Sequence, residues 1–177
     1  AYPQDVPLPP IWLLGSSGFS SQLAAMVGTG FSFAHHINGD FAVQAMTAYR
    51  REFKPSAAFP QPHSILAASV IVADTDEEAA DLALSVAFAF FSLQAGVRTN
   101  GLLSPDEVKA HPVAQAYWDA LESVRERAVF GSPATVKARL DRLIEDTQAD
   151  ELMALTMVYD HAARIHSYDL LAGVYEV

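Results

Sequence analysis

A short segment rich in serine and glycine offers the clearest possible chemistry in this sequence. Its members are Gly15, Ser16, Ser17, Gly18, Ser20 and Ser21. Glycines let a backbone approach a ligand closely, and the start of a helix presents free N–H groups at the positive end of its dipole. Serine hydroxyls add further donors, so the segment favours a phosphate ligand. An ordinary tight turn with serine caps is the alternative, and the pattern alone does not separate the two.

The same segment lacks the signatures of better-known phosphate and nucleophile sites. It contains neither Gly-x-Gly-x-x-Gly nor the Walker pattern ending in Gly-Lys, which argues against a nucleoside triphosphatase. It also lacks the Gly-x-Ser-x-Gly form of a nucleophile elbow. No arrangement of Ser, His and Asp stands out elsewhere, so the sequence identifies no catalytic residue.

Histidines occur at two places that follow predicted strands. His35 and His36 come after the run 31–34, with Asp40 as the nearest acid. A metal site needs further ligands, so a pair of polar residues at a strand end is the favoured interpretation, although one of them could line a pocket. Asp160, His161 and Arg164 follow the last predicted strand, and we expect helix capping there. The sequence therefore predicts no metal site.

Composition excludes several classes of protein. The chain has 177 residues, 51% of them hydrophobic, with 11 Lys and Arg against 21 Asp and Glu and no cysteine. A formal charge of −10 argues against non-specific nucleic-acid binding. Absence of cysteine excludes disulfides, Cys-ligated zinc and a thiol nucleophile. No apolar run approaches the roughly 20 residues of a membrane span, and residues 1–10 do not resemble a signal peptide. We expect a cytoplasmic protein without membrane contact.

Strand-like and helix-like segments alternate along the chain. The segment 1–10 holds four prolines and predicts an extended lead-in. Two capping boxes mark helix starts, one at Thr75 with Glu78 and one at Ser104 with Glu107. The four predicted strands are 11–14, 31–34, 65–73 and 152–158. The main predicted helices are 22–27, 41–53, 76–95, a short one from 105, another from about 113, one from 133, and 162–175.

Buried strands that alternate with helices predict an α/β protein with a parallel sheet. Two architectures fit this order, an open doubly wound sheet and part of a (β/α) barrel. A full barrel needs about 250 residues and eight strands. Since about four strands are predicted, the barrel interpretation corresponds to half a barrel.

Several segments, in order, resemble the bacterial luciferase-like family of flavin-dependent monooxygenases. The segments are 12–17, 24–25, 31–36, 49–50 with 53–56, 73–79, and 131–133 with 149–153. The resemblance covers essentially the whole chain. It implies the C-terminal half of a (β/α)8 TIM barrel, as one half-barrel domain over residues 1–177.

The family resemblance also implies a function and a cofactor. Members use reduced FMN, or F420 in a sister branch, and O2 to oxidise small organic substrates. The serine turn would then hold the FMN phosphate, with Gly15, Ser16, Ser17, Gly18 and Ser20 as cofactor-binding residues; F420 is the less favoured cofactor. Other family contacts, including a phosphate-binding arginine and a catalytic histidine, belong to the N-terminal half, so the catalytic residues stay unassigned.

A half-barrel exposes strand edges and one apolar face, so the resemblance implies a partner. The partner is either a second copy, giving a homo-oligomer, or a separate N-terminal half-barrel; a fragment that folds differently is the remaining case. The alternative function is a non-catalytic flavin-binding or structural half-barrel that works only as an assembly subunit.

Overall fold

The computed structural model describes residues 6 and 9–175. Most of the predicted lead-in over residues 1–10 therefore lies outside the described residues. The chain divides into two compact units, the first formed by residues 1–67 and 144–153 and the second by 68–143 and 154–177. A single half-barrel domain over residues 1–177 stays a prediction.

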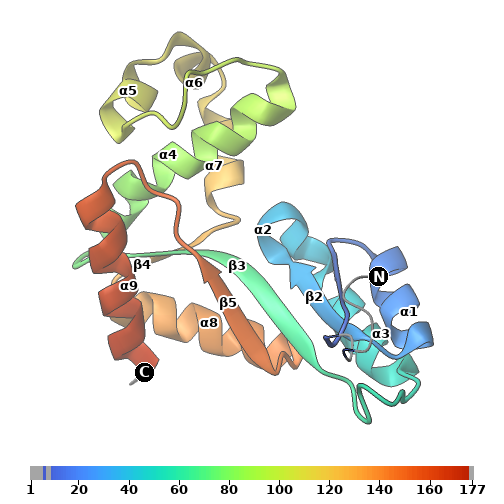
Figure 1. Cartoon of the computed structure of the whole chain (residues 1–177). Coiled ribbons are helices and arrows are strands. Elements are labelled where there is room, and N and C mark those ends of the chain that lie inside the picture. Colours follow the sequence, from blue (N-terminus) through green and yellow to red (C-terminus); the bar gives the residue numbers. More distant parts are fainter. Residues whose placement is uncertain (1–5, 7–8, 176–177) are drawn as a thin grey trace. The chain divides into compact units, whose positions relative to one another are not determined.

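Unit 1 alternates strands and helices (Figure 1). β1 (Trp12–Gly15), β2 (Gly30–Ala34) and the beginning of β3 (Ser64–Val72) pair in parallel, in that order. The connections are α1 (Gly18–Val27) and then α2 (His35–Asn38), the 3-10 turn η1 (Gly39–Phe41) and α3 (Ala42–Glu52). Because Gly15 lies opposite Phe33 in the register, β1 ends beside the place where β2 passes into α2.

The core of unit 1 is aromatic. Phe31, Phe33 and Tyr49 are fully buried, and the ring of Phe31 contacts both of the others at centroid distances of 6.2 and 5.3 Å. The Tyr49 hydroxyl donates toward the carbonyls of Thr29 and His63, at 2.9 and 3.1 Å, and accepts from the His63 N–H at 3.1 Å. Burial raises the pKa of Tyr49, so the hydroxyl stays a donor at neutral pH. Tyr49 thus links α3 to the beginnings of β2 and β3.

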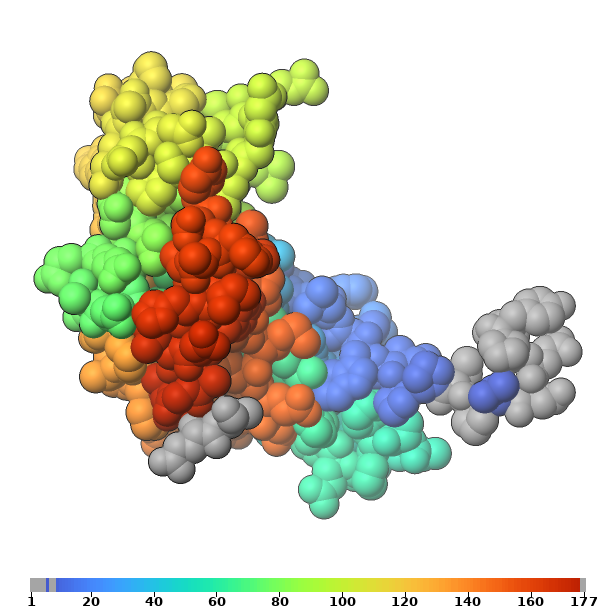
Figure 2. All heavy atoms as spheres, turned by 60° about the vertical axis from the view of Figure 1, so that its left-hand side comes forward, coloured from blue at the N-terminus to red at the C-terminus, as the bar shows by residue number. Residues whose placement is uncertain are grey.

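Unit 2 is mainly helical. It contains α4 (Asp76–Ala95), α5 (Pro105–Ala110), α6 (Pro112–Ala116), α7 (Trp118–Arg125), β4 (Val129–Gly131), most of α8 (Pro133–Thr147), the end of β5 (Glu151–Leu155) and α9 (His161–Tyr175). β4 pairs in parallel with the end of β3, and β5 also pairs with β3. The segment between α4 and α5 projects from this unit (yellow-green, Figure 2).

The predicted capping signals form as expected. The Thr75 side chain accepts from the Glu78 N–H, and α4 runs over the predicted residues 76–95. Ser104 and Glu107 form a complete capping box at the start of α5. Such caps satisfy N–H groups that have no partner inside the helix, which is why sequence locates these helix starts well.

Several element boundaries differ from prediction. All four predicted strands are present, but β4 is a fifth and was missed because its three residues are too short to show a pattern. The helix expected from Val113 breaks at Tyr117, whose φ of −126° and ψ of 35° are not helical. α1 begins at Gly18 and not at the predicted residue 22, and α3 begins at Ala42, directly after η1.

Among the described residues, α4 departs from the expectation that no segment is long and apolar enough to span a membrane. α4 has 20 residues and a window of mean hydropathy 1.3, which is long and apolar enough to cross a membrane by composition alone. Half of that window is buried, and Leu84, Ala87 and Phe88 form a core with Val108 and Leu121. A buried core helix passes the same measure, and these contacts match that case.

Candidate phosphate-binding site

The serine turn connects β1 to α1 and leaves the start of that helix open. Ser17 occupies the N-cap position with an extended backbone, φ −144° and ψ 164°, but its side chain makes no capping hydrogen bond. The first turn of α1 contains no acidic residue. Neither the Ser17 side chain nor a carboxylate of the first turn therefore caps the N–H groups at this end of α1. Such an end of a helix can accept an anion.

The serine hydroxyls of the turn have different roles. Ser20 Oγ donates to the Ser17 carbonyl at 3.0 Å and lies 3.5 Å from Ser17 Oγ. Ser21, also expected to offer a donor, is fully buried and donates to the Gly18 carbonyl at 2.9 Å, so it is structural. Ser17 is exposed, and its hydroxyl remains the donor best placed for an external ligand.

The two glycines of the turn differ in their surroundings. A Cβ at Gly15 would lie 1.9 Å from Ser20 Oγ, so only glycine allows Ser20 to pack over the end of β1. A Cβ at Gly18 would meet nothing within 4 Å, so the space beside the first helical residue is open. Together with the uncapped N–H groups, this open space fits a phosphate group.

A residue outside the predicted set also contacts the turn. Asn38, at the end of α2, donates from Nδ2 to the Ser16 carbonyl at 3.1 Å. Sequence reasoning missed Asn38, because nothing in a linear pattern relates positions 22 residues apart. The signal that could have found it is topological, since β1 and β2 are neighbours and their following segments meet at one edge.

The histidines do not gather into a metal site. His35 and His36 directly follow β2, as expected, and form the first two residues of α2. His36 Nδ1 lies 3.2 Å from the Ala67 carbonyl, and His35 is buried. Among residues 6 and 9–175, no group of three His, Asp or Glu side chains could hold a metal ion.

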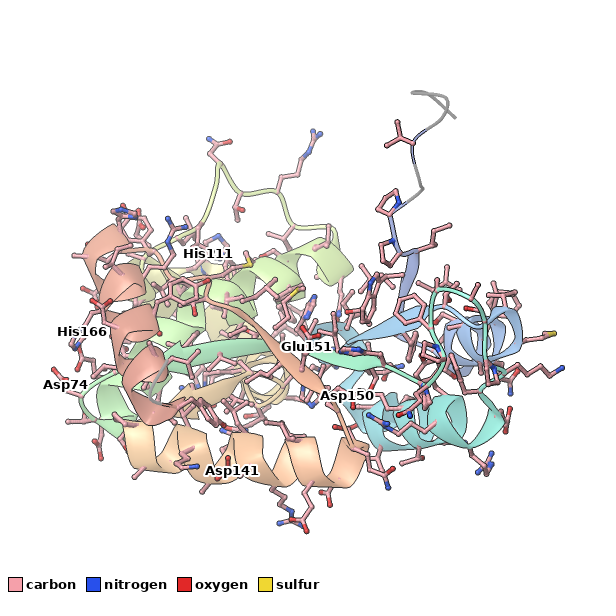
Figure 3. The ribbon with its side chains drawn as sticks, turned by 60° about the horizontal axis from the view of Figure 1, so that its bottom comes forward. Asp74, His111, Asp141, Asp150, Glu151 and His166 are labelled. Carbon is pink, nitrogen blue, oxygen red and sulfur yellow. The ribbon has the colours of Figure 1, made fainter. Side chains whose placement is uncertain are left out.

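Charged residues of unit 2 serve mainly to cap or connect elements. Asp160 Oδ1 accepts from the Ala163 N–H at 2.7 Å, which confirms the predicted capping of α9. Asp76 accepts from the Ser132 N–H at 2.6 Å and from Thr135 Oγ1 at 3.1 Å, and these bonds lower its pKa. Asp76 thereby links the start of α4 to the start of α8. His166 lies beside Asp74, at 3.1 Å (Figure 3).

Arg50 and Asp150 form an ion pair that sequence reasoning missed. Asp150 also accepts from the Ser64 N–H at 2.7 Å, and Arg50 Nε donates to the Gln148 carbonyl at 2.7 Å. Figure 3 shows Asp150 and Glu151 at the beginning of β5. Burial alone would raise the pKa of Asp150, but the bonds from Arg50 and Ser64 outweigh it and the pKa is lowered. The pair is a structural connection within unit 1.

Replacing Asp150 by asparagine should lower the free energy of unfolding by about 1–2 kcal/mol near neutral pH, since the Arg50 guanidinium loses its counter-ion. The depressed pKa means that this stabilisation is present above the unfolded value of about 3.9 and is lost as pH falls through the folded value. Urea denaturation at pH 7 and pH 3 checks this. The gap between the wild type and Asp150→Asn should narrow at pH 3; an equal gap at both values would contradict the assignment.

A sheet of parallel strands that alternate with helices defines an α/β protein. The comparisons are more specific. The model of the luciferase-like monooxygenase family matches residues 1–151, and the chain belongs to this family.

Relatives support this membership. The chain is 35% identical over 167 residues to a luciferase-like monooxygenase of Escherichia coli K12, and 36% identical over 168 residues to the uncharacterised protein YvbT of Bacillus subtilis 168. Each alignment covers 94% of this chain but only 50% and 49% of the relative. The chain therefore spans about half the length of the curated relatives that it matches.

Solved structures agree on the fold. Apo-MsnO8 superposes with a TM-score of 0.82 at 33% identity, over 99% of this chain and 53% of that one. The oxygenating constituent of 3,6-diketocamphane monooxygenase from Pseudomonas putida, solved in complex with FMN, gives a TM-score of 0.60 at 21% identity, over 92% of this chain and 47% of that one. At that identity the second likeness concerns the fold alone. The fold is thus that of the luciferase-like TIM-barrel monooxygenases, over about half of their length.

Proposed function

We propose that this chain is the phosphate-holding part of an FMN-dependent monooxygenase that acts on a small organic substrate with O2. The observation that carries the proposal is the open start of α1, with its uncapped N–H groups and exposed Ser17, in a member of this family. The proposed cofactor is FMN and not F420. The proposed location is the cytoplasm, as expected from the sequence.

Each residue of the turn has a distinct part in holding the phosphate. Ser16 and Ser17 offer backbone N–H groups, and Ser17 and Ser20 offer hydroxyls. Gly15 makes room for Ser20, and Gly18 leaves the approach open. The positive end of the α1 dipole favours the phosphate dianion. Reduced flavin, when bound, supplies the electrons for oxygen chemistry, and the residues of this chain anchor and orient its tail.

The proposal includes a partner surface. Leu14, just before the serine turn, and Phe19, between Gly18 and Ser20, are 70% and 75% exposed. Within the described part of the chain β1 pairs only with β2, so its outer edge has no strand beside it. An exposed edge with large apolar side chains favours association, either with a second copy or with an N-terminal half-barrel. A non-catalytic assembly subunit with the same phosphate site is the second candidate, and the same exposed edge of β1 favours it.

An FMN titration of the purified chain tests this function, with light scattering on the same sample to give the mass. We expect saturable micromolar quenching of flavin fluorescence, weaker binding of riboflavin, and a mass above that of one chain. If the folded chain binds FMN but reduced FMN and O2 oxidise no organic substrate in its presence, the assembly subunit is favoured. If the folded chain binds no FMN, or binds FMN no more tightly than riboflavin, the phosphate assignment is wrong.

A further inference from the structure

Asn38 makes a side-chain hydrogen bond to the serine turn from another element, α2. Its Nδ2 lies 3.1 Å from the Ser16 carbonyl oxygen, and the two residues are 22 positions apart. The reverse orientation of the amide would place two acceptor oxygens against each other, so the donor assignment follows from chemistry. The amide of Asn38 is therefore fixed with its N–H toward Ser16.

Peptide geometry passes this contact on to the next residue. The Ser16 carbonyl and the Ser17 N–H belong to the same planar, trans peptide unit, and in such a unit the C=O and N–H bonds point in opposite directions. A hydrogen bond that holds the carbonyl toward α2 consequently aims the Ser17 N–H away from α2. Donation to the carbonyl also polarises the peptide and strengthens its N–H as a donor.

We propose that Asn38 is a positioning residue that aims and strengthens the Ser17 N–H toward the phosphate of the bound flavin. This inference rests on the proposed function, because it takes the serine turn as the phosphate site. Asn38 touches the turn and not the ligand, so it acts through the Ser16–Ser17 peptide. Gly39 supports its placement, since a Cβ there would lie 3.0 Å from the buried His35 ring.

The fold should depend little on Asn38. Asn38 and Ser16 are both only partly buried, so water can replace the amide at the Ser16 carbonyl when Asn38 is truncated. The turn is held independently by the pairing of β1 with β2 and by the Ser20 and Ser21 hydroxyl bonds. Loss of Asn38 should therefore change the direction of one N–H group far more than the stability of the fold.

The test compares two flavins that differ only in the phosphate. In Asn38→Ala the FMN dissociation constant should rise about tenfold, as expected for one misdirected bond to a charged group, while riboflavin binding changes by less than about twofold. Asn38→Asp keeps the size but loses the donor and adds a negative charge, so its FMN affinity should fall further. Asn100→Ala, in the exposed segment between α4 and α5, is the matched control and should leave both flavins unchanged.

A second measurement does not depend on flavin. Inorganic phosphate added to ¹⁵N-labelled chain should move the amide proton of Ser17, and this movement should be largely lost in Asn38→Ala. Equal weakening of FMN and riboflavin, or an unchanged Ser17 response, would overturn the positioning role while leaving the phosphate site intact. If the wild type binds FMN no more tightly than riboflavin and the Ser17 amide does not respond to phosphate, both the proposed function and this inference are wrong.

Discussion

Replacing Ser17 by aspartate should reduce FMN affinity at least about fivefold and up to about a thousandfold. A unit charge about 4 Å from another costs roughly 1 kcal/mol in water and about 4 kcal/mol at the effective dielectric of a protein surface. The carboxylate would stand at the N-cap of α1, where the flavin phosphate is proposed to bind. Aspartate is itself a good N-cap and would occupy the N–H groups that the phosphate needs.

The same substitution should not weaken the fold. Ser17 makes no capping bond in the wild type, so a capping carboxylate should leave the urea midpoint unchanged or raise it. Ser123→Asp on α7 adds an equal charge at an exposed serine in unit 2 and should leave FMN binding unchanged. Retained FMN affinity in a folded Ser17→Asp chain would show that the phosphate lies elsewhere.

Truncating Tyr49 to alanine should cost about 3–5 kcal/mol of unfolding free energy, one of the largest losses available in unit 1. The ring is fully buried against Phe31 and Phe53, so its removal leaves a cavity. Three backbone groups of Thr29 and His63 also lose the hydroxyl partner. Urea denaturation followed by circular dichroism measures the loss.

Tyr49→Phe separates the hydroxyl from the ring. It keeps the packing and should cost about 1–3 kcal/mol, the penalty for leaving buried backbone groups unpaired. Phe53→Leu, at the half-buried neighbour, is the control and should cost less than either variant. If Tyr49→Phe were as stable as the wild type, the hydroxyl network would contribute nothing and only the ring would matter.

Four of the segments that resemble the family are joined in two pairs by side-chain bonds. Arg50 bonds Asp150 in unit 1, and Asp76 bonds Ser132 in unit 2. The sequence showed these residues as separate segments, because linear patterns carry no information on which distant segments touch. These bonds hold elements of each unit together, whereas the first turn of α1 has no capping bond from the Ser17 side chain.

Local signals explain what could be predicted. Caps and an apolar run define α4 to the residue, and alternation of strands and helices gives the α/β class with parallel strands. β4 has three residues and no pattern of its own, and the Asn38 contact arises only once β1 and β2 are paired. The sequence placed the serine segment after β1, but α1 begins at Gly18 and not at the predicted residue 22. The inward direction of Ser21 was not predictable either, since it depends on which side of α1 is buried.

During synthesis on the ribosome, β3 is made well before one of its strand partners. Nearly all its residues are buried, yet one of its strand partners, β5, follows it by roughly 80 residues. At about 5–20 residues per second, translation of that interval takes on the order of 4–16 s. Until β5 is synthesised, β3 lacks one of its neighbours in the sheet, so the apolar segment Ser64–Val72 stays incompletely covered in the nascent chain.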